Sequence, residues 1–428
     1  MTVFLFAMLA LMLALSIPIF VALSGTALVV FLLFSDVALE IVVMRMFSGI
    51  DKFALMSIPF FVLAANLMSA GGISQRIINL ANALVGGFRG GLAIAAVLAS
   101  MFFGAISGSS PATVVAIGGL LFPAMCREGY PKPFSTGLLA SAGSLGIIIP
   151  PSVNMIVYGA ITGVSVGALF VSGFGAGLVF GGCIIAYAYW YSRKTPSIAL
   201  KPRATGAEFL LTVRESSWGL GVPFIIIGGI YGGVFTPTEA AAVAVIYAFL
   251  VSLLVYREMT ARQYYRVLVS SAATTAQVMI VLAAASVFAW ILTAEGITRN
   301  IAAAMVSISR DKIIILLMIN IIVLLAGMFI DGASITTILA PLFLPIAVGV
   351  GIDPVHLGIV IVVNSAIGMF TPPFGLNLFV ATGITNQPLS RVTKGILPFI
   401  TITIVALTII TYFPEISLWL PRQVYGSW

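Results

Sequence analysis

Long apolar runs dominate the chain, among them Val3–Leu33, Leu92–Phe103 followed by Thr113–Met125, and Ile313–Phe329. Alone or with its neighbour, each run is long enough to cross a bilayer core of about 30 Å as helix. The runs are continuous, whereas the strands of a membrane barrel alternate apolar and polar positions. The pattern therefore predicts an all-α polytopic membrane protein.

Composition supports this class and narrows the possible partners. Hydrophobic residues make up 61% of the chain and charged residues 8%, and the mean hydropathy is +1.19. A soluble domain carries about 25% charged residues. The net charge of +7 indicates basic cytoplasmic loops in contact with membrane lipid, not a nucleic acid partner. The single histidine, His356, argues against a haem or metal enzyme.

One clearly polar segment, residues 191–218, divides the chain. It contains Arg193, Lys194 and Arg214, so the positive-inside rule predicts a cytoplasmic linker. A second basic stretch, "YREMTARQYYRVL" at 256–268, has apolar residues at helical spacing. It is typical of an amphipathic helix lying along the membrane surface.

The two flanking parts of the chain resemble one another. "SAGGISQRI" at 69–77 matches "TAEGITRNI" at 293–301, an offset of 224, and "LFPAM" at 121–125 matches "FLPIA" at 343–347, an offset of 222. "GIIIPPSVN" at 146–154 matches "GMFTPPFGLN" at 368–377 with both proline pairs 222 positions apart. We therefore expect a first repeat over 1–190 and a second over 219–428. Paired repeats of this kind are typical of secondary transporters.

Each half contains a polar hairpin motif and a double-proline break. The hairpin motifs are 104–119 ("GAISGSSPATVVAIGG") and 327–341 ("GMFIDGASITTILAP"), and the breaks lie in 144–154 and 364–377. Unwound backbone is tolerated at membrane depth only where protein or a water-filled cavity lines it. Freed carbonyls suit a cation such as Na⁺, and helix N-termini attract anions. The pattern predicts one Na⁺ site in each half, with an anionic substrate between the hairpin tips.

For any single serine, a purely structural role in helix packing stays open, because small and hydroxyl residues also let membrane helices pack closely. Asp331 is the only carboxylate in the second hairpin motif, and it could hold Na⁺, accept a proton or cap a turn. The chain has no phosphate-binding loop, so ATP hydrolysis by that route is excluded, and it has no nucleophile–base motif. We therefore expect a protein that is not an enzyme.

Four motifs together resemble the DctM-type large membrane subunit of tripartite ATP-independent periplasmic (TRAP) transporters. They are "GAISGSSPATVVAIGGLLFPAM", "GSLGIIIPPS", "GMFIDGASITTILAPLFLPIA" and "NSAIGMFTPPFGLNLF". The resemblance implies an elevator-type fold of the ion-transporter superfamily, with inverted repeats, scaffold and arm helices, and two re-entrant helical hairpins. It places the hairpins around 90–125 and 312–347 and the broken helices around 144–154 and 364–377.

The same resemblance assigns the site residues. The first Na⁺ site would comprise Ser107, Ser110, Gly146, Ile149 and Pro150, largely through carbonyl groups. The second would comprise Gly327, Asp331, Gly332, Met369 and Thr371. The residues expected to face the substrate are Ser109, Thr113, Asn154, Ser334, Thr336 and Asn377.

The resemblance implies Na⁺-coupled uptake of an organic acid, of the sialic acid or C4-dicarboxylate class, across the bacterial inner membrane. At least two Na⁺ ions would drive it without ATP. The expected partners are a small four-helix membrane subunit and a periplasmic substrate-binding protein that delivers the carboxylate. The alternatives left open are an anion channel and a Na⁺/carboxylate symporter that needs no binding protein.

Overall fold

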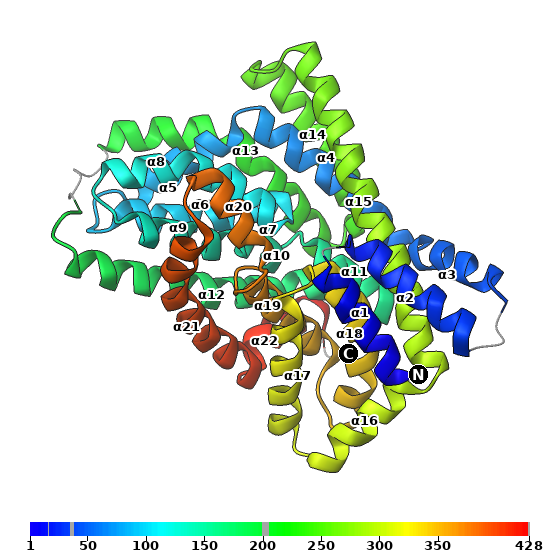
Figure 1. Cartoon of the computed structure of the whole chain (residues 1–428). Helices are drawn as coiled ribbons and strands as arrows, with labels where there is room; N and C mark the ends of the chain where they lie inside the picture. The colour runs from blue at the N-terminus through cyan, green and yellow to red at the C-terminus, as the bar shows by residue number, and fades with distance from the viewer. Residues whose placement is uncertain (16, 35–37, 199–204, 427–428) are drawn as a thin grey trace.

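The computed structural model describes residues 1–15, 17–34, 38–198 and 205–426, and within these ranges the chain is helical with no strands (Figure 1). Nine helical segments of the described chain are long and apolar enough to cross a membrane. The predicted all-α polytopic class is therefore confirmed.

The first half of the chain contains a hairpin and an interrupted helix and ends with a long helix. Its elements are α1 (Thr2–Ala14), α2 (Ile19–Phe34), α3 (Glu40–Ile50), η1 (Phe53–Met56), α4 (Ser57–Ala70), α5 (Ile73–Val85), α6 (Gly91–Ser107), α7 (Ser110–Thr113), η2 (Val114–Gly118), α8 (Gly119–Arg127), α9 (Lys132–Gly143), α10 (Leu145–Ile148), α11 (Val153–Thr162) and α12 (Val166–Lys194). We call residues 91–127, which run from α6 to α8, hairpin 1.

The second half follows a similar order. Its elements are α13 (Gly206–Tyr231), α14 (Pro237–Leu250), η3 (Val251–Tyr256), α15 (Ala261–Ala294), α16 (Ile297–Ile308), α17 (Lys312–Gly327), α18 (Gly332–Gly349), α19 (Pro354–Gly368), α20 (Leu376–Thr385), α21 (Leu389–Tyr412) and α22 (Glu415–Tyr425). We call residues 312–349, which form α17 and α18, hairpin 2.

Polar residues define where these apolar helices begin. Helices α13, α14 and α15 each start with a capping box, in which a threonine and the Glu or Gln three residues later bond each other's backbone N–H. Helices α17, α18 and α19 each start at an aspartate whose carboxylate accepts backbone N–H groups. These caps satisfy donors that a helix N-terminus leaves free. They fix the boundaries within a sequence whose hydropathy changes little.

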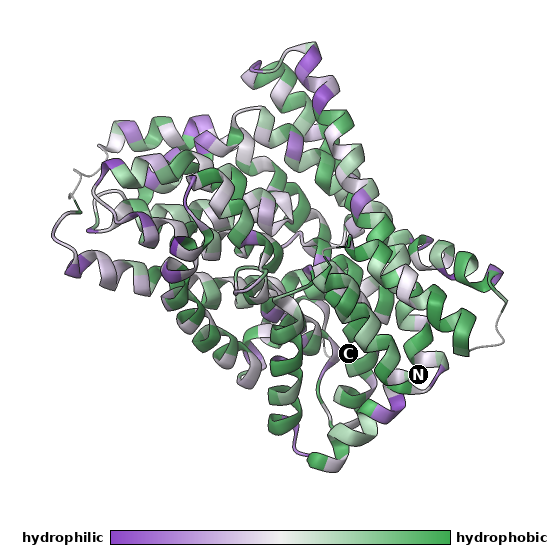
Figure 2. Ribbon diagram, in the orientation of Figure 1, coloured by the Kyte–Doolittle hydropathy of each residue, from purple (hydrophilic) through white to green (hydrophobic). Residues whose placement is uncertain are grey.

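The helices pack into two connected regions. Helices α2, α3 and α4 pack along α15, and α14 packs on α4. Hairpin 1 packs against α12 through α6, and α9 packs on α21. Hairpin 2 packs on α19, and its α18 also packs on α11 and α15. Figure 2 shows that long stretches of the helices are hydrophobic, whereas hydrophilic residues gather mainly near helix ends and connections. This distribution suits a chain surrounded by lipid along its helices.

Two boundaries differ from the sequence expectations. Helix α12 extends to Lys194 and α13 begins at Gly206, so much of the predicted linker at 191–218 is helical. Residues 199–204 of that segment lie outside the described residues. The basic stretch at 256–268 does not form a separate helix, because Arg262 and Arg266 lie in the first turns of the 34-residue α15. Within α15 the backbone groups of residues 261–268 bond along one continuous helix, so no separate surface helix is needed.

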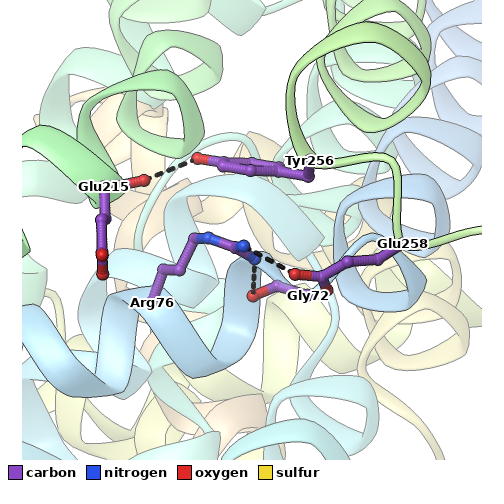
Figure 3. Close-up of polar contacts among 5 residues, drawn as sticks. All are labelled: Gly72, Arg76, Glu215, Tyr256 and Glu258. Carbon is purple, nitrogen blue, oxygen red and sulfur yellow. Dashed lines mark hydrogen bonds and ion pairs between the residues drawn. The ribbon is translucent and has the colours of Figure 1, made fainter.

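A polar cluster at Arg76 joins segments that are far apart in sequence (Figure 3). The Arg76 guanidinium donates to Glu258 Oε1 at 2.6 Å and to the Gly72 carbonyl at 3.0 Å. It also lies 3.9 Å from the ring centroid of Tyr256, whose hydroxyl donates to the Glu215 carbonyl at 2.9 Å. The cluster ties α5 to the end of η3 and to α13.

Substitution of Gly72 tests this cluster. Gly72 has a φ of +77°, and a Cβ there would overlap the Glu258 carboxylate. Gly163 has the same φ of +77° with open space around it, so Gly163→Ala is the matched control. Both alanine variants carry a left-handed backbone cost of about 1 kcal/mol. We expect Gly72→Ala to lower the melting temperature in detergent further than Gly163→Ala. Equal decreases would show that the Arg76 cluster adds nothing to stability.

Candidate functional site

The tip of hairpin 1 is a compact cluster of neutral oxygens. The chain leaves α6 at Ser107, turns through Gly108 with a φ of +60°, and re-enters helix at Ser110. Ser107 Oγ and Thr113 Oγ1 lie 3.0 Å apart, and Thr113 Oγ1 donates to the Ser109 carbonyl at 2.8 Å. Ser107, Ser110 and Thr113 are buried, whereas Ser109 is partly exposed.

The break in the first interrupted helix lies against this tip. Helix α10 ends at Ile148, the Pro150–Pro151 bond is cis, and α11 begins at Val153. A Cβ on Gly104 would lie 3.0 Å from Gly146 Cα. A Cβ on Gly146 would lie 2.6 Å from the Ser109 carbonyl oxygen and would overlap Thr113 Oγ1. The hairpin and the break therefore meet backbone to backbone, at a distance that only glycine permits.

Hairpin 2 turns at Asp331, which caps α18. One carboxylate oxygen accepts the Ala333 and Ser334 N–H groups at 3.0 and 3.1 Å, and the other accepts the Ser334 hydroxyl. Thr336 Oγ1 donates to the Gly332 carbonyl at 2.8 Å. The capping role that the sequence left open for Asp331 is thus present in the structure, and its role toward Na⁺ stays a prediction.

The second break has a similar crossing. A Cβ on Gly327 would lie 2.9 Å from Gly368 Cα, where the first limb of hairpin 2 meets the end of α19. The Pro372–Pro373 bond is cis, and the Asn377 N–H donates to the Met369 carbonyl at 2.8 Å. Thr371 Oγ1 donates to the Ile367 carbonyl at 2.7 Å. Backbone and side-chain groups near the break are therefore satisfied within the break itself.

Two asparagines link each interrupted helix to the hairpin region of the other half. Asn154, at the start of α11, donates to Ser365 Oγ at 3.3 Å and lies against Gly332 of hairpin 2. Asn377, at the start of α20, donates to Ser110 Oγ of hairpin 1 at 2.7 Å and to the Ala140 carbonyl at 3.1 Å. Correspondingly, α11 packs on α18 and α20 packs on η2.

The structure brings the residues singled out from the sequence into two clusters. Around hairpin 1 lie Ser107, Ser109, Ser110, Thr113, Gly146 and, from the other half, Asn377. Around hairpin 2 lie Asp331, Gly332, Ser334, Thr336 and, from the other half, Asn154. Ile149 and Pro150 form the first break, and Met369 and Thr371 form the start of the second. Of the six residues expected to face substrate, only Ser109 is partly exposed.

Sequence reasoning missed three residues at these crossings. Gly104 and Gly368 lie inside the recognised motifs, and each contacts a glycine of its own half, Gly146 and Gly327 respectively. The two crossings are related by offsets of 223 (Gly104 to Gly327) and 222 (Gly146 to Gly368). That repeated glycine spacing was a usable signal. Ser365 is 211 positions from its partner Asn154, and no local pattern indicates the pairing.

The donor set at the tip of hairpin 1 consists of neutral oxygens, a set that fits a monovalent cation. Hydroxyl and carbonyl oxygens converge at hairpin 1, and the Oδ1 atom of Asn377 is buried without a hydrogen-bond partner in the described chain. Transition metals favour sites built from several His, Cys, Asp or Glu ligands. Among the described residues, no group of three or more of these side chains could hold a metal ion. Hard cations take such oxygen ligands, and unwound carbonyls commonly supply them.

Comparison with known proteins defines the family. The family model "Tripartite ATP-independent periplasmic transporter, DctM component" matches residues 6–416. The C4-dicarboxylate TRAP transporter large permease protein DctM of Pseudomonas aeruginosa is 46% identical over 393 residues, which is 91% of each chain. The isethionate TRAP transporter permease protein DctMQ of Oleidesulfovibrio alaskensis is 43% identical over 97% of this chain. This chain spans 65% of that protein's length.

A further relative and two solved structures extend the comparison. The ectoine/5-hydroxyectoine TRAP transporter large permease protein UehC of Ruegeria pomeroyi is 39% identical over 97% of each chain. The YdaH transporter of Alcanivorax borkumensis shares the fold with a TM-score of 0.66 at 14% identity, over 96% of this chain and 98% of its own. MtrF of Neisseria gonorrhoeae shares it with a TM-score of 0.60 at 12% identity, over 95% and 94%.

The fold is therefore that of polytopic helical transporters, and the chain belongs to the DctM family of TRAP transporter large permeases. The family resemblance in the four motifs is confirmed.

The glycine crossing in hairpin 1 gives a testable prediction. A Cβ at Gly146 in α10 would meet the Ser109 carbonyl and the Thr113 hydroxyl of hairpin 1, whereas a Cβ at Gly119 of that hairpin would meet only Ile384 Cγ2 at 3.7 Å. Overpacking of this kind costs about 1–3 kcal/mol. We expect Gly146→Ala to lower the melting temperature clearly, with Gly119→Ala close to wild type. A Gly146→Ala variant as stable as Gly119→Ala would contradict the backbone crossing.

Proposed function

We propose that this chain is the large permease of a Na⁺-driven uptake system for small organic anions in the bacterial inner membrane. The observation that carries the proposal is the pair of hairpin tips, each set against a helix break by a glycine crossing. Membership of a transporter family supports it.

We place one Na⁺ ion at each tip. Ser107, Ser110, Gly146, Ile149 and Pro150 would hold the first ion, because their oxygens lie around the hairpin 1 crossing. The second ion would be held by Gly327, Asp331, Gly332, Met369 and Thr371, around the hairpin 2 crossing. Neutral oxygens bind Na⁺ weakly enough for release, and a transported ion must leave on the far side.

The substrate would bind between the tips, where both halves meet. Ser109 is the most accessible residue of the proposed substrate set, and Asn154 and Asn377 connect the halves. The names of the relatives favour the C4-dicarboxylate part of the expected substrate range, and they add isethionate, a sulfonate, and ectoine. All of these are small molecules with an anionic group.

We further propose an elevator movement, in which the hairpins and interrupted helices slide against a scaffold of α2, α3, α4, α14 and α15. The packing of α2, α3 and α4 along α15, and of α14 on α4, supports a scaffold of this composition, with α18 packed against it. A separate small membrane subunit and a periplasmic binding protein would complete the system, as in the tripartite family. Each Na⁺ charge entering down a potential of about 100 mV contributes about 2.3 kcal/mol.

Reconstitution tests the function directly. Proteoliposomes containing the chain with its small subunit are assayed for uptake of labelled succinate, isethionate and ectoine, with and without binding protein. We expect uptake of one probe that requires both an inward Na⁺ gradient and the binding protein. Flux without any gradient would replace the proposal with a channel. Na⁺-driven uptake by the chain without the binding protein would indicate a self-sufficient symporter.

The first Na⁺ site is tested by the double substitution Ser107→Ala and Ser110→Ala. Loss of two hydroxyl ligands should raise the Na⁺ concentration for half-maximal uptake about tenfold, which corresponds to about 1.4 kcal/mol. Ser100→Ala is the control, because Ser100 is buried in the same limb of hairpin 1 and bonds only the Ala96 carbonyl. Unchanged Na⁺ dependence in the double variant would assign these serines to packing alone.

A further inference from the structure

A small cavity lies between the scaffold and the hairpin region, away from both tips. Its volume is about 60 Å³, enough for a few water molecules or one carboxylate group. The scaffold contributes Lys52 and Ser286, and α18 contributes Thr337. Val157 and Ile161 of α11 line the same cavity. The cavity therefore lies between the scaffold and the part of the protein that would slide against it in the proposed elevator movement.

Lys52 brings a positive charge to this cavity. The residue lies between α3 and η1, and its Nζ donates to the Ala160 carbonyl of α11 at 2.9 Å. An ammonium group has three donors, so this bond leaves capacity for others. Of the Asp and Glu side chains that the structure describes, none lies within ion-pairing distance of Lys52. Lys52 is thus a partly buried cation without a carboxylate partner from the described chain.

Two hydroxyl groups accompany the ammonium. Thr337 Oγ1 donates to the Ala333 carbonyl at 2.8 Å, and Ser286 Oγ makes a long bond of 3.4 Å to the Arg45 carbonyl. A hydroxyl rotates, so either group can donate to an anion that enters the cavity. A lysine with two hydroxyls is a donor set suited to a carboxylate or sulfonate.

Helical register connects the cavity to the proposed substrate site. On α11, Val157 and Ile161 follow Asn154 by three and seven residues and so share its face of the helix. On α18, Thr337 follows Ser334 by three residues, a rise of about 4.5 Å. Helices α11 and α18 pack against each other. The seam between them therefore leads from the asparagine and serine at the tips to Lys52.

We propose that Lys52, with Ser286 and Thr337, forms a subsite that receives the anionic group of the transported substrate. The inference rests on the proposed function, since it assumes an anionic substrate at the tips. The two tip clusters supply hydroxyl and amide groups and one carboxylate, Asp331, but no Lys or Arg side chain. A carboxylate leaving water needs a counter-charge or strong donors. Lys52 supplies that charge at Ala160, six residues and about 9 Å along α11 from Asn154.

A purely structural role for Lys52 makes a different prediction. Its bond to Ala160 places a cation at the C-terminal end of α11, where a positive charge stabilises the helix. If Lys52 only fastened α11 to the scaffold, its removal would alter the rate of the transport cycle and the stability of the protein. It would leave the affinity for the substrate anion unchanged.

Three variants separate these roles. Lys52→Met removes the charge and keeps the length, Lys52→Arg keeps the charge, and Lys394→Met removes an exposed charge on α21 as the control. Uptake of succinate or isethionate, whichever wild-type proteoliposomes transport, gives KM and Vmax. Titration of the purified complex with both anions in Na⁺ buffer, followed by thermal stabilisation, gives an affinity that does not depend on transport.

We expect Lys52→Met to raise KM and weaken anion binding at least tenfold. Lys52→Arg should stay within about threefold of wild type, and Lys394→Met should equal wild type. The Na⁺ concentration for half-maximal uptake should change little, which separates this site from the cation sites. Equal anion affinity in wild type and Lys52→Met, including no binding by either, would overturn the subsite. A lack of Na⁺-driven uptake by wild-type protein would instead overturn the proposed function.

Discussion

Unwound backbone inside a membrane protein must find its hydrogen-bond partners in the protein itself, because lipid offers none. This constraint governs the two helix breaks at Pro150–Pro151 and Pro372–Pro373. Each break is covered by a hairpin of its own half, and glycines at the crossings let the two backbones approach closely. A side chain at Gly146 or Gly368 would separate hairpin from break and leave the polar groups of both uncovered.

The crossed asparagines make the two halves one site. Asn154 reaches from the first half to Ser365 beside hairpin 2, and Asn377 reaches from the second half to Ser110 at the tip of hairpin 1. Each tip region is thus hydrogen-bonded to the helix that follows the other break. Such an arrangement suits a transporter that must not move with only part of its cargo bound, because both tips have to be in place together.

Sequence reasoning reached the helical class and the two helix breaks, since continuous apolar runs and proline pairs are local signals. The repeats and the re-entrant placement of the hairpins stay predictions. It also located the tip residues, because serine, glycine and aspartate interrupt otherwise apolar segments. The pairs Asn154–Ser365 and Asn377–Ser110 were out of reach, because they join side chains 211 and 267 positions apart without a periodic pattern. The bond from Lys52 to Ala160 was hidden for the same reason. The basic stretch at 256–268 was misread as a separate helix, since amphipathic spacing does not reveal that α15 continues without a break.

The central claim is that each of the two tips holds one Na⁺ ion, and direct ion binding tests it best. Equilibrium binding of radioactive sodium to the purified chain with its small subunit, in choline buffer, measures stoichiometry and affinity together. The account predicts saturable binding of two ions per chain, and competition by potassium should be weak. In the Ser107→Ala, Ser110→Ala double variant, the affinity of one site should fall about tenfold and that of the other should stay unchanged. Absence of saturable sodium binding, or equal binding of potassium, would contradict the account.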